Sequence, residues 1–158
     1  MQPNQDAARA VVDRNQLGQT LGFMRTLLGV GHALEARSKR MQARIGVTAS
    51  QRLLLRIVGR YPGISAGELA QLMEVHASTV TGVLQRLEHR RWIVRRDDPA
   101  DRRRALLELT EEGAKIDALR TGTVEAGVRR ALGRCSEAQI TAALAVLDAV
   151  SRELVREE

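Results

Sequence analysis

Apolar side chains recur every three to four residues along most of the chain, which is the spacing of amphipathic helices. Near the N-terminus this spacing begins at Leu17 and continues to Met41. Three later segments start with Ser or Thr followed three residues on by Glu or Gln, the sequence pattern of a helix capping box. They are Thr48 to Gln51, Ser65 to Glu68 and Ser136 to Gln139. The pattern therefore predicts a mainly helical protein.

The middle of the chain combines short predicted helices with a tight break. The helix that starts after Thr48 is expected to end at residues 61–63, Tyr-Pro-Gly, because Pro and Gly stop helices. Its apolar positions are expected at Leu53, Leu54, Ile57 and Val58. A short helix then follows Ser65, and another follows a break over residues 74–76. A short helix, a tight turn and a second helix are typical of a helix-turn-helix.

After this motif the apolar period changes from helical to alternating. Residues 92–94 and 105–109 are short β-branched or alternating runs, and the segment between them holds Pro99 among aspartates. These features predict a two-stranded ribbon with a charged tip. A ribbon that directly follows a helix-turn-helix is a wing.

Two more helices are predicted after the wing, over residues 111–132 and 137–156, the first capped by Thr110. The second carries a stripe in alternating steps of four and three: Ile140, Leu144, Leu147, Ser151 and Leu154. The terminal helices have more apolar surface than a small winged domain can cover, so we expect a partner helix from a second copy of the chain. The alternative is that both ends fold back onto their own domain.

Three regions follow from this organisation. Residues 1–46 are expected to be an N-terminal arm and dimerisation helix, residues 47–109 the winged core, and residues 110–158 the C-terminal dimerisation helices. The expected fold class is thus mainly α with a small β-wing.

Positive charge is concentrated in the predicted wing. The formal net charge is +6, and residues 89–104 contain seven arginines and three aspartates, so they alone contribute +4. Such a concentration favours a polyanion partner.

Other function classes find little support in the sequence. We expect no enzyme, metal or cofactor, because spacing shows no catalytic constellation, phosphate loop or metal motif. The single cysteine, Cys135, cannot form an intramolecular disulfide. No export signal and no membrane span is evident, so a cytoplasmic protein is expected.

Residues 65–113 resemble the core of MarR-type transcriptional regulators. The matching features are STVT at 78–81, RLE at 86–88, DPADRR at 98–103 and LTEEG at 109–113. The resemblance implies a winged helix-turn-helix with one dimerisation helix before the core and two after it, and double-stranded DNA as the partner.

In such a fold the helix that begins near His76 would enter the major groove, where its first turns reach base edges. The predicted contacts are His76, Ser78, Thr79 and Thr81, with Gln85 further along. Ser and Thr read bases permissively, so the specificity of this helix should be modest. Arg86 matches a family position near the DNA backbone, and its alternative is a solvated helix face.

The resemblance also gives roles to the wing. Arg103 matches the family's wing-tip arginine, which inserts into the minor groove, and Asp101 matches the partner that holds the tip in shape. A narrow minor groove attracts arginine, and aspartates can order the loop before DNA arrives. Arg95, Arg96, Arg102 and Arg104 are expected to be phosphate contacts or wing supports. The alternative is an ordinary solvated hairpin.

Arg91 departs from the family pattern, because many relatives carry Gly at this point. Either Arg91 adopts a left-handed conformation or the helix ends differently.

The family often binds small phenolic or aromatic carboxylate effectors. Arg25 and His32 lie seven residues apart on one helix face and are candidate contacts for such an anion, the alternative being ordinary exposed residues. Cys135 lies outside the first helix, where the family's peroxide-sensing cysteine is found, and a structural role is favoured for it.

The sequence as a whole predicts a homodimeric regulator, a ligand-released repressor that binds a pseudo-palindromic operator. The alternatives are an architectural or sequence-nonspecific DNA-binding dimer and a winged-helix module that docks on acidic proteins.

Overall fold

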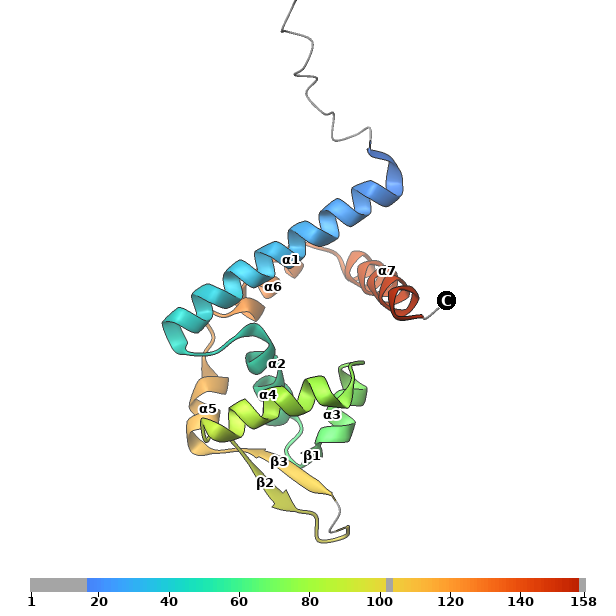
Figure 1. Ribbon diagram of the computed structural model, residues 1–158. Helices are drawn as coiled ribbons and strands as arrows, with labels where there is room; N and C mark the ends of the chain where they lie inside the picture. The colour runs from blue at the N-terminus through green and yellow to red at the C-terminus, as the bar shows by residue number, and fades with distance from the viewer. Residues whose placement is uncertain (1–16, 102–103, 157–158) are drawn as a thin grey trace, which may run out of the picture. The chain divides into compact units, whose positions relative to one another are not determined.

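The computed structural model describes residues 17–101 and 104–156 of the chain (Figure 1). Its elements in chain order are α1 (Gly18–Ile45), α2 (Ala49–Arg60), β1 (Ile64–Ser65), α3 (Ala66–Leu72), α4 (Ala77–His89), β2 (Ile93–Asp97), β3 (Ala105–Leu109), α5 (Glu111–Ala118), α6 (Val124–Leu132) and α7 (Glu137–Val155). The backbone separates into two units, residues 1–36 and 37–158, with the boundary inside α1. The fold is a mainly helical winged helix-turn-helix, as the sequence predicts.

The capping boxes expected from the sequence are all formed. In α2, α3 and α7 the side chain of the first cap residue accepts the backbone N–H three residues later, and the Glu or Gln there accepts the cap N–H. Each box satisfies two backbone donors that would otherwise have no partner at a helix start. The observed starts of these three helices therefore follow directly from local sequence.

A small antiparallel sheet follows the helix-turn-helix, with strand order β1-β3-β2. The expected ribbon is β2 paired with β3, where Arg95 lies opposite Leu107. The sequence did not predict β1, which pairs Ile64 with Leu107 on the other side of β3. Two residues are too short a run for an alternating pattern to be detected.

One apolar core joins α2, α3, α4 and the sheet. Its fully buried side chains are Leu54, Leu55, Val58, Leu69, Val80, Leu84, Leu87 and Leu107. The expected face of α2 needs one correction, because Leu53 is 49% exposed and Leu55 takes the buried position. The core fixes α4 against the sheet, and the β2–β3 hairpin projects away from the helices (Figure 1).

The single helix expected over residues 111–132 is wrong, because the chain forms two helices there. Helix α5 ends at Ala118 and α6 starts at Val124. Between them Leu119 is extended, Gly122 has a φ of +75° and Thr123 caps α6 by accepting the Ala126 N–H. A left-handed glycine and a new N-cap interrupt the helical hydrogen bonds, and the apolar period alone does not reveal such a break.

The terminal helices keep exposed apolar side chains. No residue of α7 is buried, and Leu144, Leu147 and Leu154 are 57%, 44% and 76% exposed. In the N-terminal unit Leu21 and Leu28 of α1 are more than half exposed. None of the helices within the described ranges has an apolar stretch of the length needed to cross a membrane.

Candidate nucleic-acid interface

The turn between α3 and α4 has the geometry of a compact helix end. Glu74 has a φ of +51°, and its N–H donates to the Gln71 carbonyl at 3.1 Å. The N–H of Val75 donates to the Ala70 carbonyl at 3.2 Å. These two bonds form a Schellman motif with Glu74 at the left-handed position. They hold the start of α4 next to the end of α3, within the break that the sequence predicts.

Helix α4 divides into a buried face and an exposed face. Val80, Val83, Leu84 and Leu87 face the core. The predicted DNA contacts of this helix are all exposed. The predicted base-reading residues are His76, Ser78, Thr79, Thr81 and Gln85, and the predicted contact to the DNA backbone is Arg86. The Thr81 hydroxyl donates to the Ala77 carbonyl at 2.8 Å, so it offers its lone pairs outward as an acceptor. The structure thus brings these side chains together on one helix face.

The described wing arginines are paired with glutamates. Nε of Arg95 donates to Glu88 at 2.6 Å, and Nε of Arg96 donates to Glu108 at 2.6 Å. Both pairs join β2 to a neighbouring element, α4 in the first case and β3 in the second. These ion pairs connect the hairpin to its neighbours, and the phosphate contacts expected for these arginines stay a prediction.

Arg104 ties the wing to the helix-turn-helix. Its Nη2 donates to Glu68 of α3 at 2.8 Å, and its Nε lies 3.9 Å from Asp98. Glu68 was not among the predicted site residues. The sequence marked it only as the last residue of the capping box that begins at Ser65. The backbone N–H and hydroxyl of Ser65, together with Arg104, lower the pKa of Glu68 from 4.5 to about 2. This carboxylate therefore stays ionised at neutral pH and serves the helix cap and the wing at once.

The tip of the wing is shaped by Asp98 and Asp101. The Asp98 side chain accepts the Ala100 N–H at 2.8 Å, and the Asp98 N–H donates to the Arg104 carbonyl at 3.1 Å. The Arg104 N–H donates to the Asp101 carbonyl at 2.8 Å. Asp98 was not among the predicted site residues, although an Asp before Pro is a turn signal. Arg102 and Arg103 lie outside the described residues.

The end of α4 resolves the question about Arg91. This residue has a φ of +56°, its N–H donates to the Glu88 carbonyl at 2.8 Å, and the Trp92 N–H donates to the Leu87 carbonyl at 2.9 Å. Arg91 thus adopts the left-handed conformation of a Schellman cap that usually holds glycine. The wing leaves α4 in the direction that this cap sets.

The start of α5 packs closely on the same segment. The Thr110 hydroxyl donates to the Arg91 carbonyl at 2.6 Å, and the Thr110 N–H donates to the Trp92 carbonyl at 3.1 Å. A Cβ at Gly113 would collide with the Trp92 carbonyl oxygen. The LTEEG glycine is therefore required by close backbone approach, which fixes the base of the wing.

Three further candidates lie outside the helix-turn-helix and the wing in the chain. Arg25 and His32 are exposed on α1. Cys135 is exposed at the junction of α6 and α7, where its Sγ donates weakly to the Ala131 carbonyl at 3.6 Å. Over the described ranges no His, Cys, Asp or Glu cluster could hold a metal ion.

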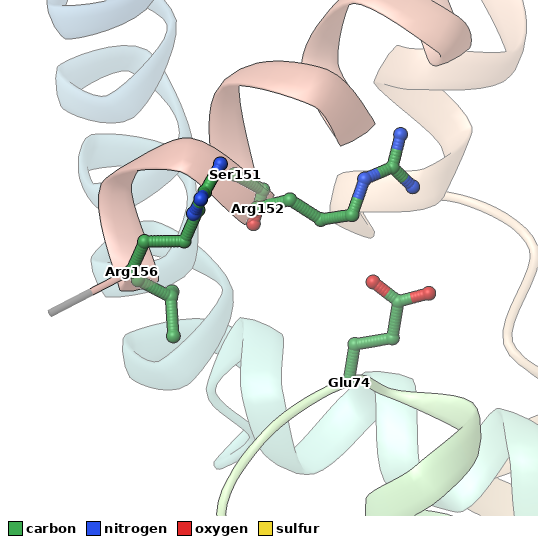
Figure 2. Close-up of a pocket in the computed structure, with 5 residues that line it drawn as sticks. Glu74, Ser151, Arg152 and Arg156 are labelled. Atoms are coloured by element: carbon green, nitrogen blue, oxygen red, sulfur yellow. The ribbon is translucent and has the colours of Figure 1, made fainter.

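A cavity of about 250 Å³ lies between the helix-turn-helix turn and α7 (Figure 2). Its lining includes Glu74, Ser151, Arg152 and Arg156. Figure 2 shows the Arg152 guanidinium pointing toward the Glu74 carboxylate. Arg156 instead forms an ion pair with Glu153 at 3.3 Å.

Comparison with known sequences is consistent with this geometry. The sequence pattern that defines the MarR family matches residues 45–104. The transcriptional regulator HosA of Escherichia coli is 33% identical over 90 residues, which are 57% of this chain and 67% of HosA. The transcriptional repressor NicR of Pseudomonas putida is 34% identical over 79 residues, 43% of this chain and 50% of NicR. The chain spans about half the length of the first curated relatives it matches, and its match to HosA spans two thirds of the length of HosA.

Solved structures share the same architecture. A crystal structure of MarR is 28% identical, with a TM-score of 0.60 and coverage of 84% of this chain and 91% of MarR. The Staphylococcus aureus MepR–DNA complex is similar in fold, with a TM-score of 0.69, 20% identity and coverage of 84% and 97%. The chain therefore belongs to the MarR family of winged-helix regulators.

Proposed function

We propose that this protein is a DNA-binding transcriptional regulator that reads a specific operator as a homodimer. The observation that carries the proposal is the exposed face of α4, where hydroxyl, imidazole and amide groups are held beside a basic wing. A helix of this kind fits the major groove, while the wing reaches the adjacent minor groove. The relatives named above as regulators, and the MepR structure solved with DNA, support the same function.

The wing supports this function through its charge balance. Glutamates neutralise the side chains of Arg95, Arg96 and Arg104, and these ion pairs hold the hairpin in one conformation. An ordered wing loses less conformational entropy on binding than a flexible loop would. Arg103 is then proposed as the minor-groove contact, supported by Asp101 as the family resemblance implies.

A two-fold dimer is proposed because α7 leaves its apolar stripe uncovered. Exposed leucines at positions 144, 147 and 154, spaced by three and seven residues, are suited to packing against another helix. Two recognition helices related by two-fold symmetry would read a pseudo-palindrome with half-sites about one helical turn, roughly 34–36 Å, apart. In this arrangement residues 1–46 and 110–158 supply the dimerisation helices and residues 47–109 the reading domain.

We further propose repression that a small anionic effector relieves. The repressors among the relatives support the sign of regulation. Arg25 and His32 remain the proposed effector contacts, exposed on the first helix. The test is the titration of aromatic carboxylates against a preformed protein–DNA complex, with Arg25→Gln as the variant expected to need a higher effector concentration for release.

The experiment that tests DNA reading is fluorescence-anisotropy binding to a labelled fragment of the gene's own upstream region. Unlabelled random DNA is added as competitor at near-physiological salt. A specific regulator retains binding with a specificity ratio of roughly 10³ or more. Equal competition by random DNA would instead favour an architectural protein that binds without sequence preference.

A further inference from the structure

The break between α5 and α6 is the point at which the winged core passes into the C-terminal helices. Helix α5 belongs to the core, because Thr110 and Gly113 at its start pack on the Trp92 backbone. The chain then runs through Leu119, which is extended, and Gly122, which has a φ of +75°, before α6 starts. A few residues at such element ends can absorb the changes of φ and ψ that reorient one rigid part on another. The orientation of α6 on the core must therefore be fixed by contacts across this break.

Apolar packing gives α6 little support against the core. Of the nine residues of this helix, all of which the structure describes, only Ala126 is buried, together with the N-cap Thr123 just before the helix. Val128 and Leu132 are 44% and 42% exposed. Apolar contact is also non-directional, so one small buried side chain does not determine the angle of a helix. Directional polar contacts across the break are needed to set that angle.

Arg52 of α2 supplies such contacts. Its side chain is only 2% exposed, and its Nε donates to Oε1 of Glu125, in the first turn of α6, at 2.5 Å. The same guanidinium donates through Nη2 to the Leu119 carbonyl at 2.7 Å and through Nη1 to the Ile116 carbonyl. A guanidinium is planar, and its N–H groups point in fixed directions. One rigid side chain therefore joins the end of α5, the break and the start of α6 to α2.

Helix α2 passes this orientation on to α4. Leu54, Leu55 and Val58 of α2 are fully buried in the same core as Leu84 and Leu87 of α4. Protein cores are packed as densely as organic crystals and transmit strain rather than absorb it. Helices α2 and α4 therefore turn as one body, and a change of angle at the Arg52 contacts reaches the exposed face of α4.

We propose that Arg52 is a positioning residue for DNA reading, which acts through Glu125 and the Leu119 carbonyl. By fixing the winged core on α6 in each protomer, it sets the distance and rotation between the two copies of α4, and hence the half-site spacing that the dimer accepts. The inference rests on the proposed function, because it needs a dimer that reads two half-sites. A buried ion pair adds little stability over apolar side chains of similar volume, and its best-attested use is to specify one arrangement.

The test compares two spacings of one operator. The probes are the inverted repeat that the protein enriches from a randomised duplex pool and the same repeat lengthened by two base pairs at its centre. The insertion rotates one half-site by about 70° around the DNA axis, since one turn holds 10–10.5 base pairs. Each of two equal half-sites contributes the square root of the specificity ratio, so a ratio of roughly 10³ predicts that the wild type binds the longer probe about 30-fold more weakly.

The decisive variant is Arg52→Met combined with Glu125→Leu, which replaces the ion pair by apolar side chains of similar volume. Such a replacement keeps the packing, so the urea midpoint should stay close to that of the wild type. The ratio of the affinities for the two probes should nevertheless fall from about 30 toward 1, because the winged core is then free to reorient on α6. The conservative variant Glu125→Gln keeps an oxygen that accepts from Nε and should keep the wild-type ratio.

The matched control is Arg56→Met combined with Asp117→Leu. This ion pair, at 2.9 Å, also starts from α2, but it ends on α5 and so does not cross the break. Losing it should leave the ratio of the two affinities unchanged.

A folded Arg52 double variant that keeps the wild-type ratio would overturn the positioning role and leave the proposed function standing. If that variant does not fold, Glu125→Ala makes the same comparison, because it removes a side chain that is 32% exposed and keeps the bonds of Arg52 to α5. A wild-type ratio in Glu125→Ala would likewise overturn the role. A wild-type protein that enriches no inverted repeat would overturn the proposed function itself.

Discussion

Arg52 of α2 and Glu125 of α6 form an ion pair in which Nε donates to Oε1 at 2.5 Å, and the Arg52 side chain is only 2% exposed. The same guanidinium donates to the carbonyls of Ile116, Asp117 and Leu119 at the end of α5. Burial alone would raise the pKa of Glu125, but hydrogen bonds from its own N–H and from Arg52 outweigh burial and lower it. One buried arginine thus holds the break between α5 and α6 against the winged core.

We expect Arg52→Ala to destabilise the fold strongly. The substitution removes the donor that joins the Leu119 carbonyl and the partly buried Glu125 carboxylate to α2, and breaking a buried pair typically costs about 3–5 kcal/mol. Urea denaturation at fixed protein concentration measures this loss. The matched control is Arg56→Ala, because Arg56 pairs with Asp117 at 2.9 Å but is 36% exposed. An exposed pair contributes about 0–1 kcal/mol. Equal losses in both variants would contradict the role given to Arg52.

Arg91→Gly should increase the free energy of unfolding by roughly 1 kcal/mol. A left-handed conformation costs a residue with a Cβ about 1–2 kcal/mol, and glycine avoids most of this cost. Arg91→Ala is the control, since it removes the same charge but keeps the Cβ. The glycine variant is expected to be the more stable of the two in thermal unfolding. If the two variants unfold alike, the φ of +56° is not a source of strain.

The link between Glu68 and the wing should weaken in acid. The pKa of Glu68 is lowered from 4.5 to about 2 by its hydrogen bonds with Ser65 and Arg104. A lowered pKa means that its contribution to stability is complete above pH 4.5 and is lost as the pH falls toward 2. The stability difference between the wild type and Glu68→Gln should therefore shrink over this window. A carboxyl NMR titration in which Glu68 titrates near 4.5 would exclude the ionised link.

Leu144→Glu combined with Leu147→Glu should convert the proposed dimer into a monomer. Both side chains are exposed on the same stripe of α7, and a buried unpaired carboxylate at a helix interface is strongly unfavourable. Light scattering at micromolar concentration gives the mass directly. Ala142→Glu lies on the opposite side of α7 and should leave the dimer intact. A wild-type protein that is monomeric under these conditions would refute the dimer itself.

The parts of the fold predicted from sequence are those fixed by local chemistry. Capping boxes located the starts of α2, α3 and α7, and the change of period located the β2–β3 ribbon. Two features escaped the sequence pattern. β1 is only two residues long, and the break at Leu119 is stabilised by Arg52, 67 residues earlier in the chain. Such a long-range hydrogen bond leaves no local signal.

The candidate site shows the same division. The exposed face of α4 follows from helical period, because the buried positions Val80, Val83 and Leu87 define its opposite side. The partners of the wing arginines did not follow from sequence. Glu68, Glu88 and Glu108 lie 36, 7 and 12 residues from the arginines they bind. Only the tertiary arrangement shows which glutamate pairs with each of these arginines.

In the proposed dimer, two copies of α4 read DNA across a two-fold axis. Selection from a pool of duplexes with a randomised central region, followed by sequencing, measures this reading. Such a dimer should enrich one inverted repeat whose half-sites are centred about 10–10.5 base pairs, or a multiple of this, apart. Recovery of a pool without any enriched motif, or of a single unrepeated site, would contradict it.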